Sequence, residues 1–176
     1  MRNKIILNLA MSLDGYIADE DGGYAWIRGN GDSRLNTPEK WDFQAFLRRV
    51  DAVVMGHACY DQNMHTEFAG KRVFVATGTP HPDVGNVRFI GGDVVGRILE
   101  ERERADGDIY LFGGGKLADA FLKSDVVDEF IIGVIPMLLG KGRPLFYGNN
   151  PMVELKLIHY IVEDGVVILR YVRNEA

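Results

Sequence analysis

The strongest chemical signal in the chain is a run of three glycines that is followed by a lysine. The run Phe112-Gly113-Gly114-Gly115-Lys116-Leu117 follows an apolar segment and precedes residues with helical periodicity. Backbone amides at a helix N-terminus bind anions, and glycine lets a phosphate approach the backbone closely. A plain tight turn needs only one glycine. We therefore predict that this segment binds the phosphates of a dinucleotide.

The run matches neither of two common nucleotide-binding motifs. Its glycines lack the spacing of the Rossmann motif, and no acidic residue follows at the expected distance. A P-loop would require Gly-Lys-Ser/Thr at the end of the loop, which is also missing. The predicted phosphate site therefore has another architecture.

Small and polar residues also follow the other predicted strands. The segment Ala10-Met11-Ser12-Leu13-Asp14-Gly15-Tyr16-Ile17-Ala18 comes directly after an apolar strand, where an open α/β sheet binds its ligands. An Asp-Gly turn alone explains this segment equally well. Gly56 and His57 end a second strand and Thr77 and Thr79 a third, and hydroxyls with a cation would suit a ribose or its phosphate.

Apolar strands that alternate with helices predict an α/β fold with right-handed crossovers and a largely parallel sheet. Asp164-Gly165 is a typical hairpin turn, so the last two strands are predicted to be antiparallel. Thr37 and Pro38 are typical of an N-cap and a first helical position. The predicted strands are 5–11, 52–56, 72–77, 86–90, 108–112, 127–136, 156–163 and 166–173, and the helices begin at 38, 93 and 116.

Composition narrows the class of protein. The chain has 176 residues and a net charge of −5, which argues against non-specific nucleic-acid binding. Its single cysteine, Cys59, excludes an internal disulfide, and no spacing of Cys and His suggests a metal site. The N-terminal apolar run is too short for a signal peptide or a membrane span. We expect one domain over residues 1–176, located in the cytoplasm.

Four segments together resemble a known family. They are Ala10 to Gly15, Val54-Met55-Gly56, Phe112 to Leu117, and Ile135-Pro136-Met137-Leu138-Leu139-Gly140-Lys141-Gly142-Arg143-Pro144-Leu145-Phe146. Their order and spacing resemble the dihydrofolate-reductase-like fold and, more closely, the C-terminal reductase domain of the bifunctional riboflavin-biosynthesis deaminase-reductase. The resemblance implies a three-layer αβα fold with a mixed, mainly parallel sheet. It also implies an NADPH-dependent reductase that acts on a ribosylamine or another heterocycle.

The resemblance also implies where the cofactor binds. The backbone of Ala10 and the side chain of Ile17 would border the nicotinamide. Residues 113–117 would hold the pyrophosphate, with a cis peptide between the first two glycines, and Thr77 and Thr79 would lie near the adenosine ribose and its 2′-phosphate. His57 follows Met-Gly where the family usually has Arg or Lys. A neutral imidazole binds phosphate more weakly than a guanidinium, so the preference for NADPH over NADH needs a test.

The catalytic and substrate-binding residues are less defined. A carboxylate could support protonation, and a tryptophan on the long 14–38 loop could either cover a flat substrate or anchor that loop. Cations of the 135–146 segment could bind a substrate phosphate or be solvated. These candidates are Asp14, Glu39, Asp42, Trp26, Lys141 and Arg143. Two other functions stay open, dihydrofolate reductase proper and a non-catalytic nucleotide-binding protein, and a homodimer is possible.

Overall fold

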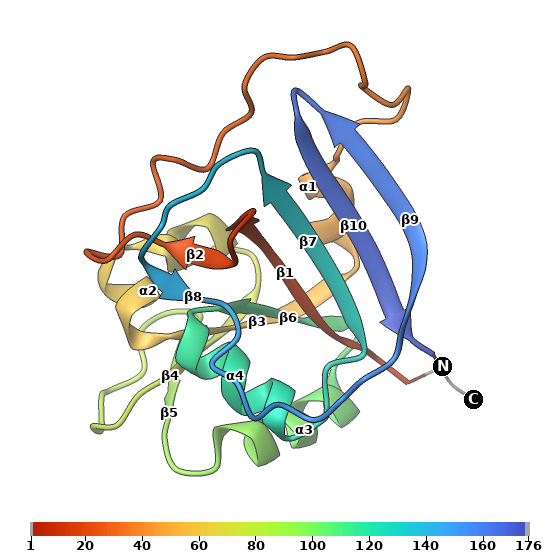
Figure 1. Cartoon of the computed structure of the whole chain (residues 1–176). Helices are drawn as coiled ribbons and strands as arrows, with labels where there is room; N and C mark the ends of the chain where they lie inside the picture. Colours follow the sequence, from red (N-terminus) through yellow and green to blue (C-terminus); the bar gives the residue numbers. More distant parts are fainter. Residues whose placement is uncertain (1, 175–176) are drawn as a thin grey trace.

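The computed structural model describes residues 2–174, which fold around one central eight-stranded sheet (Figure 1). Its strands are β1 Ile5–Ser12, β3 Val50–Gly56, β4 Arg72–Ala76, β5 Val87–Ile90, β6 Asp108–Gly113, β7 Glu129–Ile135, β9 Leu155–Glu163 and β10 Val166–Arg173. Their order is β5-β4-β3-β6-β1-β7-β10-β9. The first six are parallel, and the β9–β10 hairpin joins β7 in antiparallel fashion. The predicted mixed sheet with an antiparallel C-terminal hairpin is confirmed.

Both faces of the sheet are covered by helices, as predicted for three layers. The helices are α1 Phe43–Arg48, α2 His57–Asp61, the 3₁₀ helix η1 Met64–Phe68, α3 Val94–Arg104 and α4 Gly115–Lys123. Side chains alternate along a strand, so Ile5 and Leu7 of β1 join the core under α3 and α4. Ile6 joins the second core, under α1 and η1. Among residues 2–174, no helix is long and apolar enough to span a membrane.

The predicted start of the first helix was wrong. Helix α1 begins at Phe43, because Asp42 is the residue whose carboxylate accepts from the free amide of Ala45, at 2.8 Å. Thr37 is used elsewhere: its hydroxyl accepts from the amide of Val162 in β9, at 3.1 Å. The residues before α1 are therefore hydrogen-bonded to the sheet and do not form a helix.

The 14–38 segment crosses from the sheet to the β9–β10 turn (Figure 1). Near its start, the short strand β2 (Tyr16–Ala18) pairs with β8 (Arg143–Pro144) in a separate two-stranded ribbon. At its far end the amide of Asn30 donates to the carbonyl of Asp164 at 2.8 Å. The loop therefore lies fixed against two distant parts of the chain.

A buried carboxylate organises the amino-terminal end of the sheet. Glu129 is the first residue of β7 and is fully buried. Its oxygens accept from Arg170 at 2.6 Å, from Arg49 at 3.1 and 3.3 Å and from Lys4 at 3.1 Å. Burial alone raises the pKa of Glu129, but the hydrogen bonds from Arg170 and Arg49 outweigh it, so the pKa falls below its usual range. The group is thus an ion cluster that joins β7 and β10 to the residue before β1 and to the C-cap of α1.

Candidate active site

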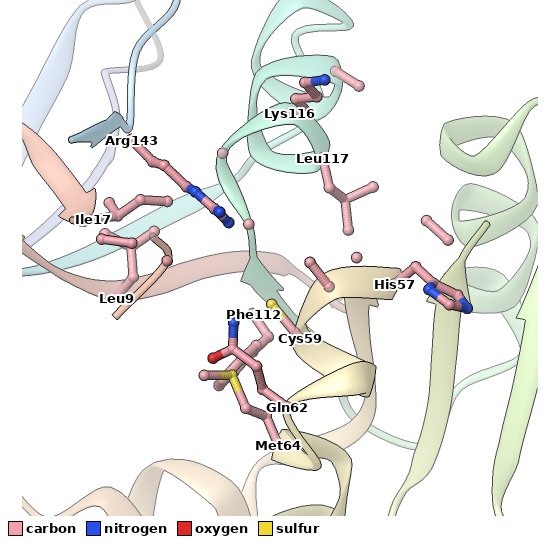
Figure 2. A pocket seen from close by; sticks show the side chains of 18 of the residues that line it. Leu9, Ile17, His57, Cys59, Gln62, Met64, Phe112, Lys116, Leu117 and Arg143 are labelled. Carbon is pink, nitrogen blue, oxygen red and sulfur yellow. The ribbon is translucent and has the colours of Figure 1, made fainter. Parts of the chain in front are cut away.

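A cavity of about 1260 Å³ lies at the carboxyl ends of the parallel strands (Figure 2). Strands β1, β3, β4 and β6 end at its wall, and the first turns of α3 and α4 begin there. The β2–β8 ribbon, with Ile17 and Arg143, forms the opposite side. Its principal lining residues are Asn8, Leu9, Ala10, Ile17, Gly56, His57, Cys59, Gln62, Met64, Glu67, Thr77, Asp93, Tyr110, Phe112, Gly114, Gly115, Lys116, Leu117 and Arg143.

The glycine turn opens directly into this cavity. Strand β6 ends at Gly113, which has φ +110° and is joined to Gly114 by a cis peptide bond, as the resemblance implied. A Cβ on Gly114 would meet no atom within 4 Å, so open space lies beside it. Gly114 is the N-cap of α4 and offers no side-chain acceptor, so the first amides of the helix are available to a ligand. This arrangement fits a bound phosphate.

Gly115 has a different role from that of its neighbour. A Cβ at this position would lie 2.7 Å from the carbonyl oxygen of Pro144 and 2.9 Å from the ring of Tyr147. Glycine is therefore needed here because the β8 segment packs directly against the start of α4. Of the adjacent pair, only Gly114 faces free space.

The second wall of the cavity carries histidine and hydroxyl groups. His57, at the start of α2, contacts Asp61 through Nδ1 at 3.1 Å, and its Nε2 is buried without a partner in the described part of the chain. The Thr77 hydroxyl donates to the carbonyl of Thr79 at 2.9 Å. Asp93 accepts from the amide of Gly96 at 2.9 Å and so caps α3. The Nε2 atom of His57 is therefore the group on this wall that could form a hydrogen bond with a ligand.

Arg143 and Cys59 face each other across the middle of the cavity (Figure 2). The Arg143 guanidinium packs against the backbone of Gly22, where a Cβ would lie 2.9 Å from it. Burial raises the pKa of the Cys59 thiol, and contacts with the Gly114 and Gly56 backbone and the charge of Arg143 offset that only in part. Cys59 is therefore a neutral thiol, and Arg143 is the cation whose charge acts on it.

The end of the cavity toward η1 combines aromatic and polar side chains. We name it the η1 end, and it is formed by Asn8, Gln62, Met64, Glu67 and Tyr110. Gln62 and Met64 lie next to Phe112 in Figure 2. Sequence reasoning did not identify any of these residues as site residues. The one available signal was an asparagine inside an otherwise apolar strand.

Most of the predicted cofactor residues come together in the cavity. Residues from the ends of β1, β3, β4 and β6, from β2, and from the starts of α2 and α4 share its wall. They are Ala10, Ile17, Gly56, His57, Thr77, Phe112, Gly114, Gly115, Lys116 and Leu117, and the predicted substrate residue Arg143 joins them. Gly113 and Thr79 lie directly beside lining residues but do not line the cavity themselves.

Asp14 lies outside the cavity lining and holds a loop. Its carboxylate accepts from the Ser12 hydroxyl at 2.6 Å and from the amides of Leu139 and Gly140 at 3.1 and 2.8 Å. The Ser12 hydrogen bond is the main reason that the pKa of Asp14 is lowered. Since its acceptor sites are used in this way, Asp14 fixes the 137–140 segment and is not placed to supply a proton.

The remaining candidates also lie outside the cavity lining. Glu39 contacts His159 of β9 at 2.9 Å, and Asp42 is the N-cap of α1. Trp26 is buried, and its Nε1 donates to the carbonyl of Gly23 at 3.3 Å, as expected for a loop anchor. Lys141 is largely exposed and pairs with Glu20 on the neighbouring loop. Within residues 2–174, no three His, Cys, Asp or Glu side chains gather as a metal site would require.

Comparison with solved structures identifies the fold. A protein from Shewanella sp. PV-4, assigned to riboflavin biosynthesis, superposes with a TM-score of 0.80 at 30% identity, covering 98% of this chain and 99% of the other. The Thermotoga maritima diaminohydroxyphosphoribosylaminopyrimidine deaminase/5-amino-6-(5-phosphoribosylamino)uracil reductase gives 0.72 at 21% identity, covering 98% of this chain and 57% of its own. Dihydrofolate reductase from Enterococcus faecalis, complexed with NADP(H), gives 0.68 at 14% identity, with 99% of both chains covered. The predicted dihydrofolate-reductase-like fold is confirmed.

Sequence comparison gives the family. The Bacillus subtilis (strain 168) protein YwjB, which is uncharacterised, is 33% identical over 184 residues, covering 98% of this chain and 99% of its own. The family model for the RibD C-terminal domain matches residues 3–73 and 93–168. The matched residues include β1, the glycine turn and the β8 segment, and they omit residues 74–92, which hold the end of β4, the next loop and β5. The chain belongs to the RibD C-terminal domain family.

Proposed function

We propose that the chain is an NADPH-dependent reductase of the riboflavin-pathway type, which transfers hydride to a ribosylamine or related heterocyclic substrate. One observation carries the proposal: a single cavity connects the open N-terminus of α4 with a polar and aromatic end. A dinucleotide needs the first feature and a flat heterocycle the second. NADPH, when bound, supplies the hydride.

The residues of the glycine turn fit the pyrophosphate. The free amides of Gly115, Lys116 and Leu117 and the positive end of the α4 dipole would hold it. Arg143 reaches the same space from β8 and would neutralise a second phosphate, either of the cofactor or of the substrate. Ile17 supplies an apolar surface next to Arg143 (Figure 2).

Protonation of the substrate needs a group at the η1 end. Among the described residues that line the cavity, the carboxylates are Glu67 and Asp93. Asp93 is engaged as the cap of α3. Glu67 is the remaining carboxylate at this end of the cavity, and we assign it the role of proton donor. A dihydrofolate reductase would need a carboxylate from residues 37–42 in the cavity. Here Glu39 contacts His159 and Asp42 caps α1, which favours the riboflavin-type substrate.

A turnover assay tests the proposal. We expect the chain to oxidise NADPH when 5-amino-6-(5-phosphoribosylamino)uracil is added and to leave dihydrofolate unreacted. The measurement is the loss of reduced-nicotinamide absorbance, with product identified by mass spectrometry. Faster oxidation with dihydrofolate would show a dihydrofolate reductase. Tight NADPH binding without turnover of either compound would support the non-catalytic alternative.

The side chain at position 57 should set how strongly the protein binds the 2′-phosphate of the cofactor. Replacing it with arginine, His57→Arg, should raise the preference for NADPH over NADH about tenfold, because a guanidinium binds phosphate with two charged hydrogen bonds. The dissociation constants of both cofactors would be measured by fluorescence titration. His159→Arg adds a similar charge outside the cavity lining and should leave the ratio unchanged. Equal affinity of the unaltered protein for both cofactors would contradict the assignment of NADPH.

A further inference from the structure

Two histidines are in contact where the chain passes from the cavity wall to the loop between β4 and β5. His57 lines the cavity on the far side from Ile17 (Figure 2). Its imidazole lies against that of the exposed His81, with ring centroids 4.9 Å apart, and Phe89 packs beside both rings at 6.2 and 5.0 Å. Two imidazolium ions in contact repel each other, so charging both is favoured only beside an anion.

Hydrogen bonds determine which nitrogen of His57 is offered to a ligand. Nδ1 of His57 lies 3.1 Å from the Asp61 carboxylate, and Nε2 of His81 lies 3.1 Å from the Thr79 hydroxyl. An ionised carboxylate only accepts, so in the neutral His57 ring the proton is on Nδ1 and Nε2 carries a lone pair. That Nε2 is buried and has no partner among residues 2–174. A phosphate oxygen is also an acceptor, so it can pair with this Nε2 only after the ring takes up a proton.

Charged and titratable groups surround the pair on every element packed against it. They are Asp61 on α2, Asp83 and Arg88 around β5, Asp93 at the start of α3, Lys116 at the start of α4, and His65 of η1, which stacks on Tyr60. Asp83 pairs with Arg88 at 3.4 Å and Asp93 caps α3, so Asp61 is the carboxylate that acts directly on His57. At this wall, imidazoles are the groups whose charge changes near neutral pH.

We infer that His57 and His81 bind the 2′-phosphate of the cofactor as a proton-dependent pair, so that NADP⁺ binding takes up protons that NAD⁺ binding does not. His81 is then a further specificity-determining residue. The inference rests on the proposed reductase function, since it adds a condition to the nucleotide site of that enzyme. Imidazoles change charge between about pH 5 and 8, and a phosphate monoester loses its second proton at about pH 6. The preference for NADP⁺ should therefore be greatest near neutrality and fall in alkali, where the imidazoles are neutral.

The test measures the dissociation constants of NADP⁺ and NAD⁺ by calorimetry from about pH 6.5 to about pH 8.5. In the unaltered protein the preference for NADP⁺ should fall at least about tenfold over this range. In His57→Arg, whose guanidinium stays charged, it should fall less than about threefold. His81→Gln should lower the preference at the acid end about three- to tenfold and leave NAD⁺ binding unchanged. His159→Gln, outside the cavity lining, should keep the pH dependence of the unaltered protein.

Calorimetry in two buffers with different heats of ionisation measures the protons directly. At about pH 7.5, NADP⁺ should take up at least about half a proton more than NAD⁺, and His57→Gln/His81→Gln should abolish this excess while binding NAD⁺ normally. Equal proton uptake with both nucleotides, a preference for NADP⁺ that is constant with pH, or an excess that persists in the double variant would overturn the inference alone. Failure of the unaltered protein to bind either nucleotide would instead overturn the proposed function.

Discussion

Gly114→Val should lower the affinity for NADPH at least about 100-fold while the protein remains folded. The new side chain enters the space beside Gly114, where nothing lies within 4 Å, and so occupies the place of the phosphate. Each charged hydrogen bond to a backbone amide contributes about 1.5–3 kcal/mol, and displacement of the phosphate breaks more than one. The dissociation constant would be measured by fluorescence titration, and the melting temperature by calorimetry.

The control for this variant is Gly70→Val. Gly70 also has open space around it, but it does not line the cavity. It should therefore bind NADPH as the unaltered protein does. Gly115→Ala is unsuitable as a control, because its Cβ would collide with the Pro144 carbonyl and with Tyr147. Unchanged NADPH binding by folded Gly114→Val would show that the turn is not the phosphate site.

Glu129→Gln should be the most destabilising of the conservative substitutions considered. Removing one partner of a buried ion pair costs about 3–5 kcal/mol, and Glu129 is shared by Arg170, Arg49 and Lys4. Because these cations are partly exposed to solvent, we expect a loss of unfolding free energy near the lower end of that range. For a chain of this length, a loss of about 3 kcal/mol lowers the melting temperature by roughly 6–12 °C.

The effect of Glu129 should depend on pH. Its folded-state pKa lies below the ordinary value of 4.5, so its contribution to stability is complete above that pH and is lost as the pH falls through the folded-state pKa. The difference in unfolding free energy between the two proteins should therefore shrink in acid. Asp125→Asn, which removes an exposed pair with Arg173, should change stability by less than about 1 kcal/mol. Urea titrations over a pH series would measure both, and a constant difference would refute this account.

Most of the parallel strands were predictable because they are largely apolar runs that are buried on both faces, although the edge strand β5 carries the exposed Arg88. The hairpin was predictable from Asp164-Gly165 alone. Helix α2 and the 3₁₀ helix η1 were not predicted, since each has five residues and is too short to show periodicity. Both lie in the crossover that joins β3 to its parallel neighbour β4, and both contribute residues to the cavity wall.

For the site, the glycine turn was predictable because its chemistry is local. The role of Asp14 was not, because its partners at 139 and 140 lie far along the chain and meet it only after folding. Likewise, Asn8 and Tyr110 reach the same cavity because strand β1 lies next to β6, and sequence patterns do not specify that strand order. Glu39 and Asp42 looked like catalytic groups because a carboxylate near a helix start has the same appearance whether it caps, pairs or reacts.

The two ends of the cavity are built from different parts of the polypeptide, and this affects how the protein can evolve. The α4 end offers main-chain amides, which every residue except proline provides, so the open space beside Gly114 is its one demand on residue type. The η1 end depends on the identities of individual side chains such as Asn8 and Tyr110. In the proposed reductase, substitutions at the η1 end should therefore change the ring that the cavity accepts and leave the nucleotide site intact. Divergent relatives of this fold are expected to share one cofactor and to differ in what they reduce.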